Sequence, residues 1–129
     1  MQDRLDLHIW VDPVNAEDLV DEALEEPSEI VAQRVASARA IQLERFAKEK
    51  IFTNSQMDAG LLRKYCHIGR TENEFLKEII RKLRLSGRAY SRILKISRTI
   101  ADLAGNESIS LPDIAEAVRF RSLDREREI

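Results

Sequence analysis

The chain has 129 residues and a mass of 14.9 kDa, with 43% hydrophobic residues, 34% charged residues and a formal net charge of −2 at pH 7. This length is that of one domain or part of one, and the composition argues against wholesale disorder and against a generally basic nucleic-acid binder. The single cysteine, Cys66, excludes an intramolecular disulfide, and no apolar run approaches the ~20 residues of a membrane span. We therefore expect a soluble cytoplasmic protein that makes no membrane contact.

The first expected element is a β-strand near the N-terminus. Every second residue is apolar over residues 5–11, which is the period of a half-buried strand, and Asp12-Pro13 ends the pattern. No second strand of this quality follows, and a lone strand leaves its backbone groups unpaired. We therefore expect residues 1–14 to be the last strand of a truncated domain core, with pairing to another chain as the alternative.

Everything after residue 14 is predicted to be helical. Residues 15–27 form an acidic linker with a short helix at about 16–25, which Asn15 caps and Pro27 closes. Residues 28–129 follow as one helical domain, and Ser28 is expected to cap its first helix, at about 29–50. The predicted fold class is all-α, a helical bundle preceded by one orphan β-strand.

Four more helices are predicted after a polar connector. They are expected at about 57–66, from 71 onward, at 87–104 and at 111–121. Thr71 and Glu74 have the spacing of a capping box at the start of the second of these helices. Gly105 is the expected left-handed residue after the third, and Ser110 is expected to open the fourth, with Pro112 and Asp113 in its first turn.

Charge is concentrated in two segments of opposite sign. Residues 1–30 hold ten acidic residues and one basic residue, and residues 77–98 hold eight basic residues and one acidic residue. The local balances are therefore −9 and +7, although the net charge of the chain is small. The sequence leaves open whether these segments contact each other, a neighbouring molecule or an anion.

The basic segment holds the first candidate site. Arg88, Arg92 and Lys95 fall at i, i+4 and i+7 on one face of a predicted helix, and Arg81 and Arg84 precede them. Such a stripe can bind the phosphates of a nucleotide or of a nucleic-acid backbone, and the alternative is a solvated face that pairs with the acidic segment. Arg88 stands in the first turn, where the helix dipole does not favour a cation, so a bound anion explains its position better.

Arg4 is the second candidate. It stands between Asp3 and Asp6, directly before the apolar strand. It either pairs with these acids or is held at the strand end, where it reaches an anion across a subunit boundary.

The sequence contains no complete catalytic or metal-binding motif. Cys66 and His67 are adjacent, and such a pair is neither a zinc site nor a nucleophile faced by its base. No GxxxxGK[ST], GxGxxG or HExxH motif is found. We expect no metal site, and we interpret Cys66 as a core thiol beside a partly exposed imidazole.

Three sequence runs have the form of known family motifs. The first is Asp3-Arg4-Leu5-Asp6-Leu7-His8, of the form D-R-[IFL]-D-[LI]-H. The second covers residues 85–95 and has the form L-S-A-R-A-Y-x-R-I-L-[RK], with Gly87 where alanine is usual. The third, I-A-E-A-V followed by R-S-L-D, covers residues 114–124. Together they resemble the magnesium-chelatase-like AAA+ ATPases, in the competence-associated (ComM/YifB-type) branch.

The resemblance implies that this chain is the last core strand and the C-terminal helical lid of a P-loop ATPase. By position, Arg4 resembles the arginine finger that contacts the γ-phosphate of a neighbouring subunit's ATP, and Arg88 resembles the sensor-2 arginine of the lid. Arg84, Arg92 and Lys95 are further candidates for phosphate or DNA contacts. The family's Walker A lysine and Walker B acids have no counterpart in this sequence.

The resemblance also implies cofactors and partners for an intact parent protein. These are ATP and Mg²⁺, the missing ATPase core of the same chain, copies that form a ring, and DNA as the substrate of a motor linked to DNA processing and competence. The fragment alone is not expected to be an enzyme or to hold a cofactor. The alternatives are a stand-alone helical module that binds DNA through residues 81–95 and a bundle that binds another protein.

Overall fold

The computed structural model describes residues 6–9, 11, 13 and 25–121. The elements are α2 (Ser28–Arg45), the short 3-10 helix η2 (Asn54–Gln56), α3 (Ala59–Tyr65), α4 (Arg70–Leu83), α5 (Gly87–Leu103) and α6 (Leu111–Arg119). The predicted all-α bundle is confirmed over these ranges, in which no residue forms a strand. Within them, no helix combines the length and apolar content needed to cross a bilayer.

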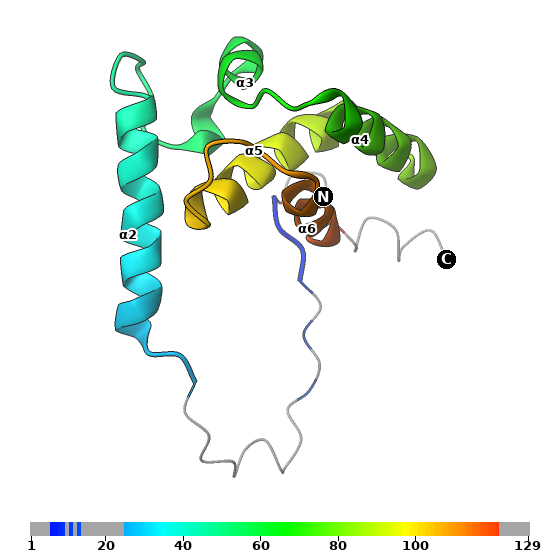
Figure 1. Cartoon of the computed structure of the whole chain (residues 1–129). Coiled ribbons are helices and arrows are strands. Elements are labelled where there is room, and N and C mark those ends of the chain that lie inside the picture. The colour runs from blue at the N-terminus through cyan, green and yellow to red at the C-terminus, as the bar shows by residue number, and fades with distance from the viewer. Residues whose placement is uncertain (1–5, 10, 12, 14–24, 122–129) are drawn as a thin grey trace.

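The core is built around α5, which contacts α2, η2, α3, α4 and α6 (Figure 1). Apolar residues on α5 recur at three- and four-residue spacing, so one face of the helix is buried. Ile93 on this face is fully buried in one hydrophobic cluster with Leu76 of α4 and Ile114 of α6. The Phe46 ring packs edge-on against Tyr65 with centroids 5.3 Å apart, which joins the end of α2 to α3.

A buried polar cluster fixes α2 against α5. The Asp102 carboxylate accepts hydrogen bonds from Arg45 of α2 (2.6 and 2.8 Å), Arg98 of α5 (3.1 Å) and Asn54 of η2 (2.9 Å). Arg98 also donates to two backbone carbonyls in the loop between α5 and α6. Buried charges are tolerated where they are paired and hydrogen-bonded, so this cluster holds the two helices, η2 and the loop in one arrangement.

The predicted signals around the last two helices are confirmed. Gly105 follows α5 with φ +73°, in the left-handed region that glycine adopts without strain. Ser110 and Asp113 form a capping box at the start of α6, and Pro112 lies in its first turn. The reciprocal hydrogen bonds satisfy backbone donors that the helix itself leaves unpaired.

Two other predicted caps are wrong by one or two residues. Pro27 is the N-cap of α2, so Ser28 is already the first helical residue and makes no cap hydrogen bond. Gly69 is the N-cap of α4, with extended backbone, so Thr71 lies inside the helix and forms no capping box. The Glu74 carboxylate pairs instead with Arg70 one turn earlier, at 3.3 Å.

The helix predicted over 29–50 ends early, at Arg45. Phe46 is buried in the core, and Arg45 is held by Asp102, so the chain turns at this point. The next predicted helix is also shorter, because Asp58 caps α3 by accepting a hydrogen bond from the Leu61 N–H.

The predicted strand and acidic helix fall largely outside the described residues. Residues 6–9 have no regular secondary structure, and the His8 N–H donates to the Phe120 carbonyl at the end of α6. The strand stays a prediction, because residues 5, 10 and 12 of this segment lie outside the described residues. The helix at about 16–25 also stays a prediction, because residues 14–24 are not described.

Candidate functional site

The basic residues singled out in the sequence meet at the turn between α4 and α5. Arg84 ends α4 in the left-handed conformation, with φ 51° and ψ 44°. This lets the Leu85 N–H donate to the Ile80 carbonyl at 3.0 Å, and Leu85 then packs against the core. A left-handed residue other than glycine costs about 1 kcal/mol. The turn therefore holds Arg84 exposed, directly before α5.

Ser86 opens α5 with a side-chain cap. Its Oγ accepts a hydrogen bond from the Ala89 N–H at 3.3 Å, and its carbonyl accepts one from the same N–H at 3.0 Å. The N–H groups of Gly87 and Arg88 lie in the first turn, where a helix supplies no acceptor. This end of α5 therefore presents backbone donors and the positive end of the helix dipole.

Arg88 lies exposed at this helix end. In the described part of the chain it has no ion pair or side-chain hydrogen bond. A guanidinium beside free N–H groups is an arrangement suited to a phosphate, because both supply donors to one anion. Arg88 therefore lies in the first turn of its helix, as the sequence predicted.

Arg92 and Lys95 are engaged within the chain. Arg92 Nε lies 3.3 Å from Asp6 Oδ1, and its side chain is 21% exposed. Lys95 Nζ donates to the Ser55 carbonyl at 3.1 Å. The stripe of three bases is thus divided, because only Arg88 can take a ligand without giving up a contact in the described structure. The Asp6–Arg92 pair is one contact between an acid of the N-terminal segment and the basic segment.

The remaining basic residues near the turn are on α4. Lys77 and Arg81 are exposed, as is Arg84 after them, whereas Lys82 pairs with Glu78 at 3.1 Å. Arg4 lies outside the described residues, so the structure does not relate it to Arg88.

Cys66 is buried, as interpreted from the sequence, and the neighbouring His67 is exposed. Burial raises the pKa of the Cys66 thiol to about 11, and its Sγ lies 4.0 Å from Met57 Sδ. A protonated thiol in the core is a poor nucleophile. Over the described ranges, no group of three or more His, Cys, Asp or Glu residues is placed to hold a metal ion.

The cluster around Asp102 was missed by the sequence reasoning. Its one local signal is the i,i+4 spacing of Arg98 and Asp102 on α5. Arg45 lies 57 residues away in sequence and Asn54 lies 48 residues away, so no local pattern relates them to Asp102.

Comparison with known proteins gives one consistent family. The profile described as magnesium chelatase, subunit ChlI C-terminal, matches residues 25–121. Competence protein ComM of Haemophilus influenzae is 41% identical over 100 residues, which are 78% of this chain and 19% of that protein. The protein YifB of Escherichia coli is 36% identical over the same shares. A Mycobacterium tuberculosis protein, Rv2897c, is 30% identical over 97% of this chain and 25% of its own length. The chain therefore spans about a fifth to a quarter of these relatives.

Proposed function

This chain belongs to the family of magnesium chelatase subunit ChlI C-terminal domains, and on that premise we propose that it is the helical lid of an AAA+ ATPase. In this proposal Arg88 is the sensor-2 arginine, which contacts the phosphates of bound ATP. The lid contributes charge to a site whose other parts belong to an ATPase core.

The placement of Arg88 carries the proposal. It is exposed, lies in the first turn of the central helix, and has no partner among the described side chains. A cation at this end of a helix is unfavourable without an anion. A polyphosphate would remove this penalty, and the planar guanidinium can bind two of its oxygens.

The residues of this chain fit only the part of a nucleotide site that a lid would supply. The sequence contains no GxxxxGK[ST] loop, so the lysine and backbone donors that cradle phosphates would come from the core, and Mg²⁺ would be held there. ATP with Mg²⁺ supplies the phosphoryl group that is transferred to water. Arg88 would stabilise charge on that group, and Arg4 would do so from a neighbouring copy, which requires a ring of copies.

We place this ATPase in the cytoplasm and relate it to DNA processing. The relative with 41% identity is named a competence protein, and the lone cysteine of this chain is buried and reduced. DNA contacts would use the exposed bases Lys77, Arg81 and Arg84, because Arg92 and Lys95 already have partners. A stand-alone DNA-binding module is the second candidate, and the same bases support it.

ATP turnover by the intact protein that carries this domain tests the proposal. We expect Arg88→Ala to lower turnover at least tenfold, because one charged donor to the phosphates is lost, and Arg88→Lys to recover part of it. Arg63→Ala is the matched control, since Arg63 is equally an exposed arginine of the domain, on α3. Turnover that is unchanged in Arg88→Ala, or lowered equally in the control, would remove the sensor role.

A further inference from the structure

A cavity of about 340 Å³ lies where α2 meets η2 and α5. The α2 side chains that line it recur at i, i+3, i+4 and i+7, so they belong to one face of the helix. They are Val35, Ala38, Arg39 and Gln42. Residues 53–55 line the cavity from the side of η2, and Leu103 lines it from the end of α5. Its volume is in the range of pockets that hold small molecules.

Gln42 is buried, yet it leaves one of its amide groups unused. It is 7% exposed, and its Oε1 accepts a hydrogen bond from the Asn54 N–H at 3.0 Å. Its Nε2 has no hydrogen-bond partner among the described residues and keeps a solvent-accessible surface. Since the rest of the side chain is enclosed, Nε2 faces the cavity that Gln42 lines. A polar group buried in this way is normally satisfied by a partner, so the cavity wall offers a donor to an acceptor on a ligand.

Arg39 adds a positive charge beside this amide. It is exposed, lies three residues before Gln42 on the same helix face, and has no ion pair or side-chain hydrogen bond in the described part of the chain. The other two arginines of α2, Arg34 and Arg45, each hold an acid. The guanidinium and the amide therefore present donors to the same space.

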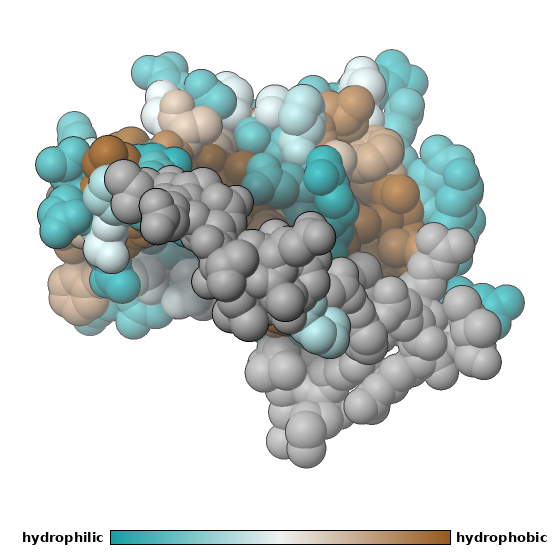
Figure 2. All heavy atoms as spheres, turned by 90° about the horizontal axis from the view of Figure 1, so that it is seen from below, coloured by the Kyte–Doolittle hydropathy of each residue, from teal (hydrophilic) through white to brown (hydrophobic). Residues whose placement is uncertain are grey.

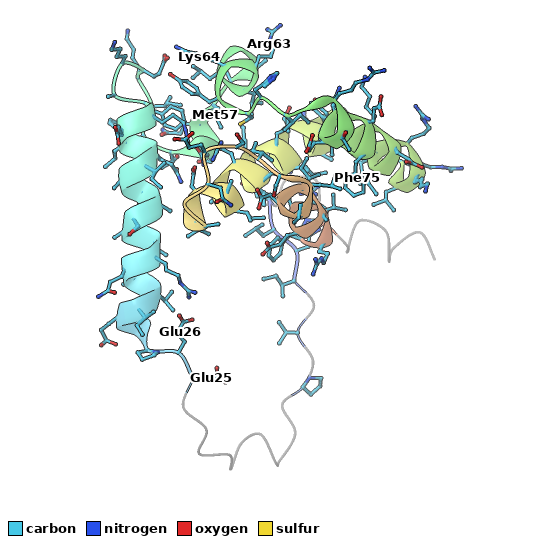
Figure 3. The ribbon with its side chains drawn as sticks, viewed as in Figure 1. Glu25, Glu26, Met57, Arg63, Lys64 and Phe75 are labelled. Carbon is cyan, nitrogen blue, oxygen red and sulfur yellow. The ribbon has the colours of Figure 1, made fainter. Side chains whose placement is uncertain are left out.

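The acids at the start of α2 lie away from the cavity, and no Asp or Glu of the described ranges lines it. Figure 3 shows Glu25 and Glu26 at the beginning of α2, where Arg34 holds Glu26. Arg39 lies about 16 Å along the helix from its first residue, at 1.5 Å per residue. The charge of Arg39 is therefore not met by an acid of the described structure.

The buried cluster behind the cavity is also positive. It holds the guanidinium groups of Arg45 and Arg98 against the single carboxylate of Asp102. Asn54 joins the cluster to the cavity, because it lines the cavity and donates a hydrogen bond to Asp102 at 2.9 Å. The electrostatic potential in the cavity therefore favours an anion.

The remaining wall of the cavity is apolar. Val35 on α2 and Leu103 on α5 are 44% and 45% exposed, and both also line a second cavity of about 410 Å³ toward the N-terminal half of α2. Figure 1 shows this half of α2 extending beyond the other helices, and Figure 2 shows apolar residues beside polar ones on the face seen from that end. An apolar group on a ligand would cover both side chains.

We propose that this cavity binds a small aliphatic carboxylate. The carboxylate oxygens accept hydrogen bonds from the Arg39 guanidinium and from Gln42 Nε2, and the carbon chain lies against Val35 and Leu103. A carboxylate brings one negative charge to the single cation of the lining, whereas a phosphate monoester brings about −1.5 to −2. At about 30 Å³ per water molecule, the cavity takes a ligand of about ten non-hydrogen atoms.

Titration of the full chain with hexanoate, followed by methyl NMR, tests the proposal. We expect saturable shifts of the Val35 and Leu103 methyl resonances. Hexanamide and hexylamine have the same carbon chain without the negative charge, so we expect them to bind at least fivefold more weakly. Shifts that do not saturate, or equal affinities for hexanoate and hexylamine, would overturn the proposal.

Two substitutions test the two donors. Arg39→Gln removes the charge of an exposed residue, and Gln42→Glu replaces the amide nitrogen by oxygen while keeping an acceptor for the Asn54 N–H. We expect each to weaken hexanoate binding at least fivefold. Lys48→Gln and Gln33→Glu are the matched controls, at exposed positions that do not line the cavity. Unchanged affinity in either test variant, or an equal loss in the controls, would contradict the assignment.

Far-UV circular dichroism checks that the variants keep the helical bundle. Because Arg39 is exposed, Arg39→Gln keeps the test decisive even if Gln42→Glu destabilises the fold.

N-acetylleucine distinguishes two sources of the carboxylate. Tighter binding of N-acetylleucine than of hexanoate would assign the cavity to the carboxyl terminus of a protein chain, and weaker binding would assign it to a free acid. Both results require Arg39, and neither depends on nucleotide contact by Arg88.

Discussion

Arg45 and Asp102 form a two-point ion pair in which the carboxylate side chain has no exposed surface and the guanidinium side chain is 13% exposed. The pair joins the end of α2 to the end of α5, and Arg98 and Asn54 complete its hydrogen bonds. It therefore holds α2 in position against α5 and η2.

Asp102→Asn is expected to destabilise the fold by about 3–5 kcal/mol, because it leaves two arginines without their buried counter-charge. Urea unfolding measures the change in the free energy of unfolding. Glu78→Gln is the control, since Glu78 belongs to an exposed i,i+4 pair with Lys82 and should cost about 0.5 kcal/mol or less. Equal effects of the two substitutions would contradict a structural role for the buried pair.

Arg84→Gly is expected to stabilise the fold by about 1 kcal/mol, because glycine adopts the left-handed conformation of this residue without strain. Arg81→Gly, in the last turn of α4 with a helical backbone, should instead destabilise it by up to about 1 kcal/mol. Thermal unfolding of the two variants gives the comparison. Destabilisation by both would show that the Arg84 side chain contributes more than its backbone costs.

Gly87→Ala is expected to stabilise the fold by about 0.4–1 kcal/mol, through a smaller loss of backbone entropy on folding. A Cβ at Gly87 meets no atom within 4 Å, so this turn has room for the alanine that is usual at this position of the family motif. Gly105→Ala is the control and should destabilise, because Gly105 has φ +73°. Urea unfolding measures the change. A loss of stability in Gly87→Ala would contradict this expectation and would show that the turn needs glycine at this position.

Stability should fall in alkali partly because of Cys66. Burial raises the pKa of its thiol from 9.0 to about 11, so the folded state keeps a proton that the unfolded chain loses. The unfolded chain binds fewer protons between these values, so the free energy of unfolding falls as pH rises from about 9 toward 11. Cys66→Ala should show a shallower fall over this range in urea midpoints. Parallel curves for the two proteins would contradict the assignment.

Local sequence patterns were sufficient to predict the bounds of helices whose buried face follows from their own apolar periodicity. α5 and α6 were predicted within two residues because their apolar stripes and the signals at Gly105 and Ser110 agree. The early end of α2 was not predictable from these patterns, since it depends on the burial of Phe46 and on Arg45 meeting Asp102 from 57 residues away.

In the candidate site, too, local patterns predicted the helix positions but not the contacts with residues distant in sequence. Helix spacing placed Arg88, Arg92 and Lys95 on one stripe, and it gave the exposed first-turn position of Arg88 correctly. The partners that occupy Arg92 and Lys95 come from residue 6 and from η2, which no helical pattern relates to α5. The left-handed Arg84 was also missed, because the sequence has no glycine at that end of α4.

The proposed contact of Arg88 with bound nucleotide is tested most directly by the ratio of two affinities. In the intact protein, the Kd values for a non-hydrolysable ATP analogue and for ADP are measured before and after Arg88→Ala. If Arg88 contacts the γ-phosphate, the variant weakens binding of the analogue about tenfold or more and leaves ADP binding nearly unchanged, so the preference for the analogue falls. An unchanged ratio, with both ligands bound as before, would contradict the assignment of Arg88.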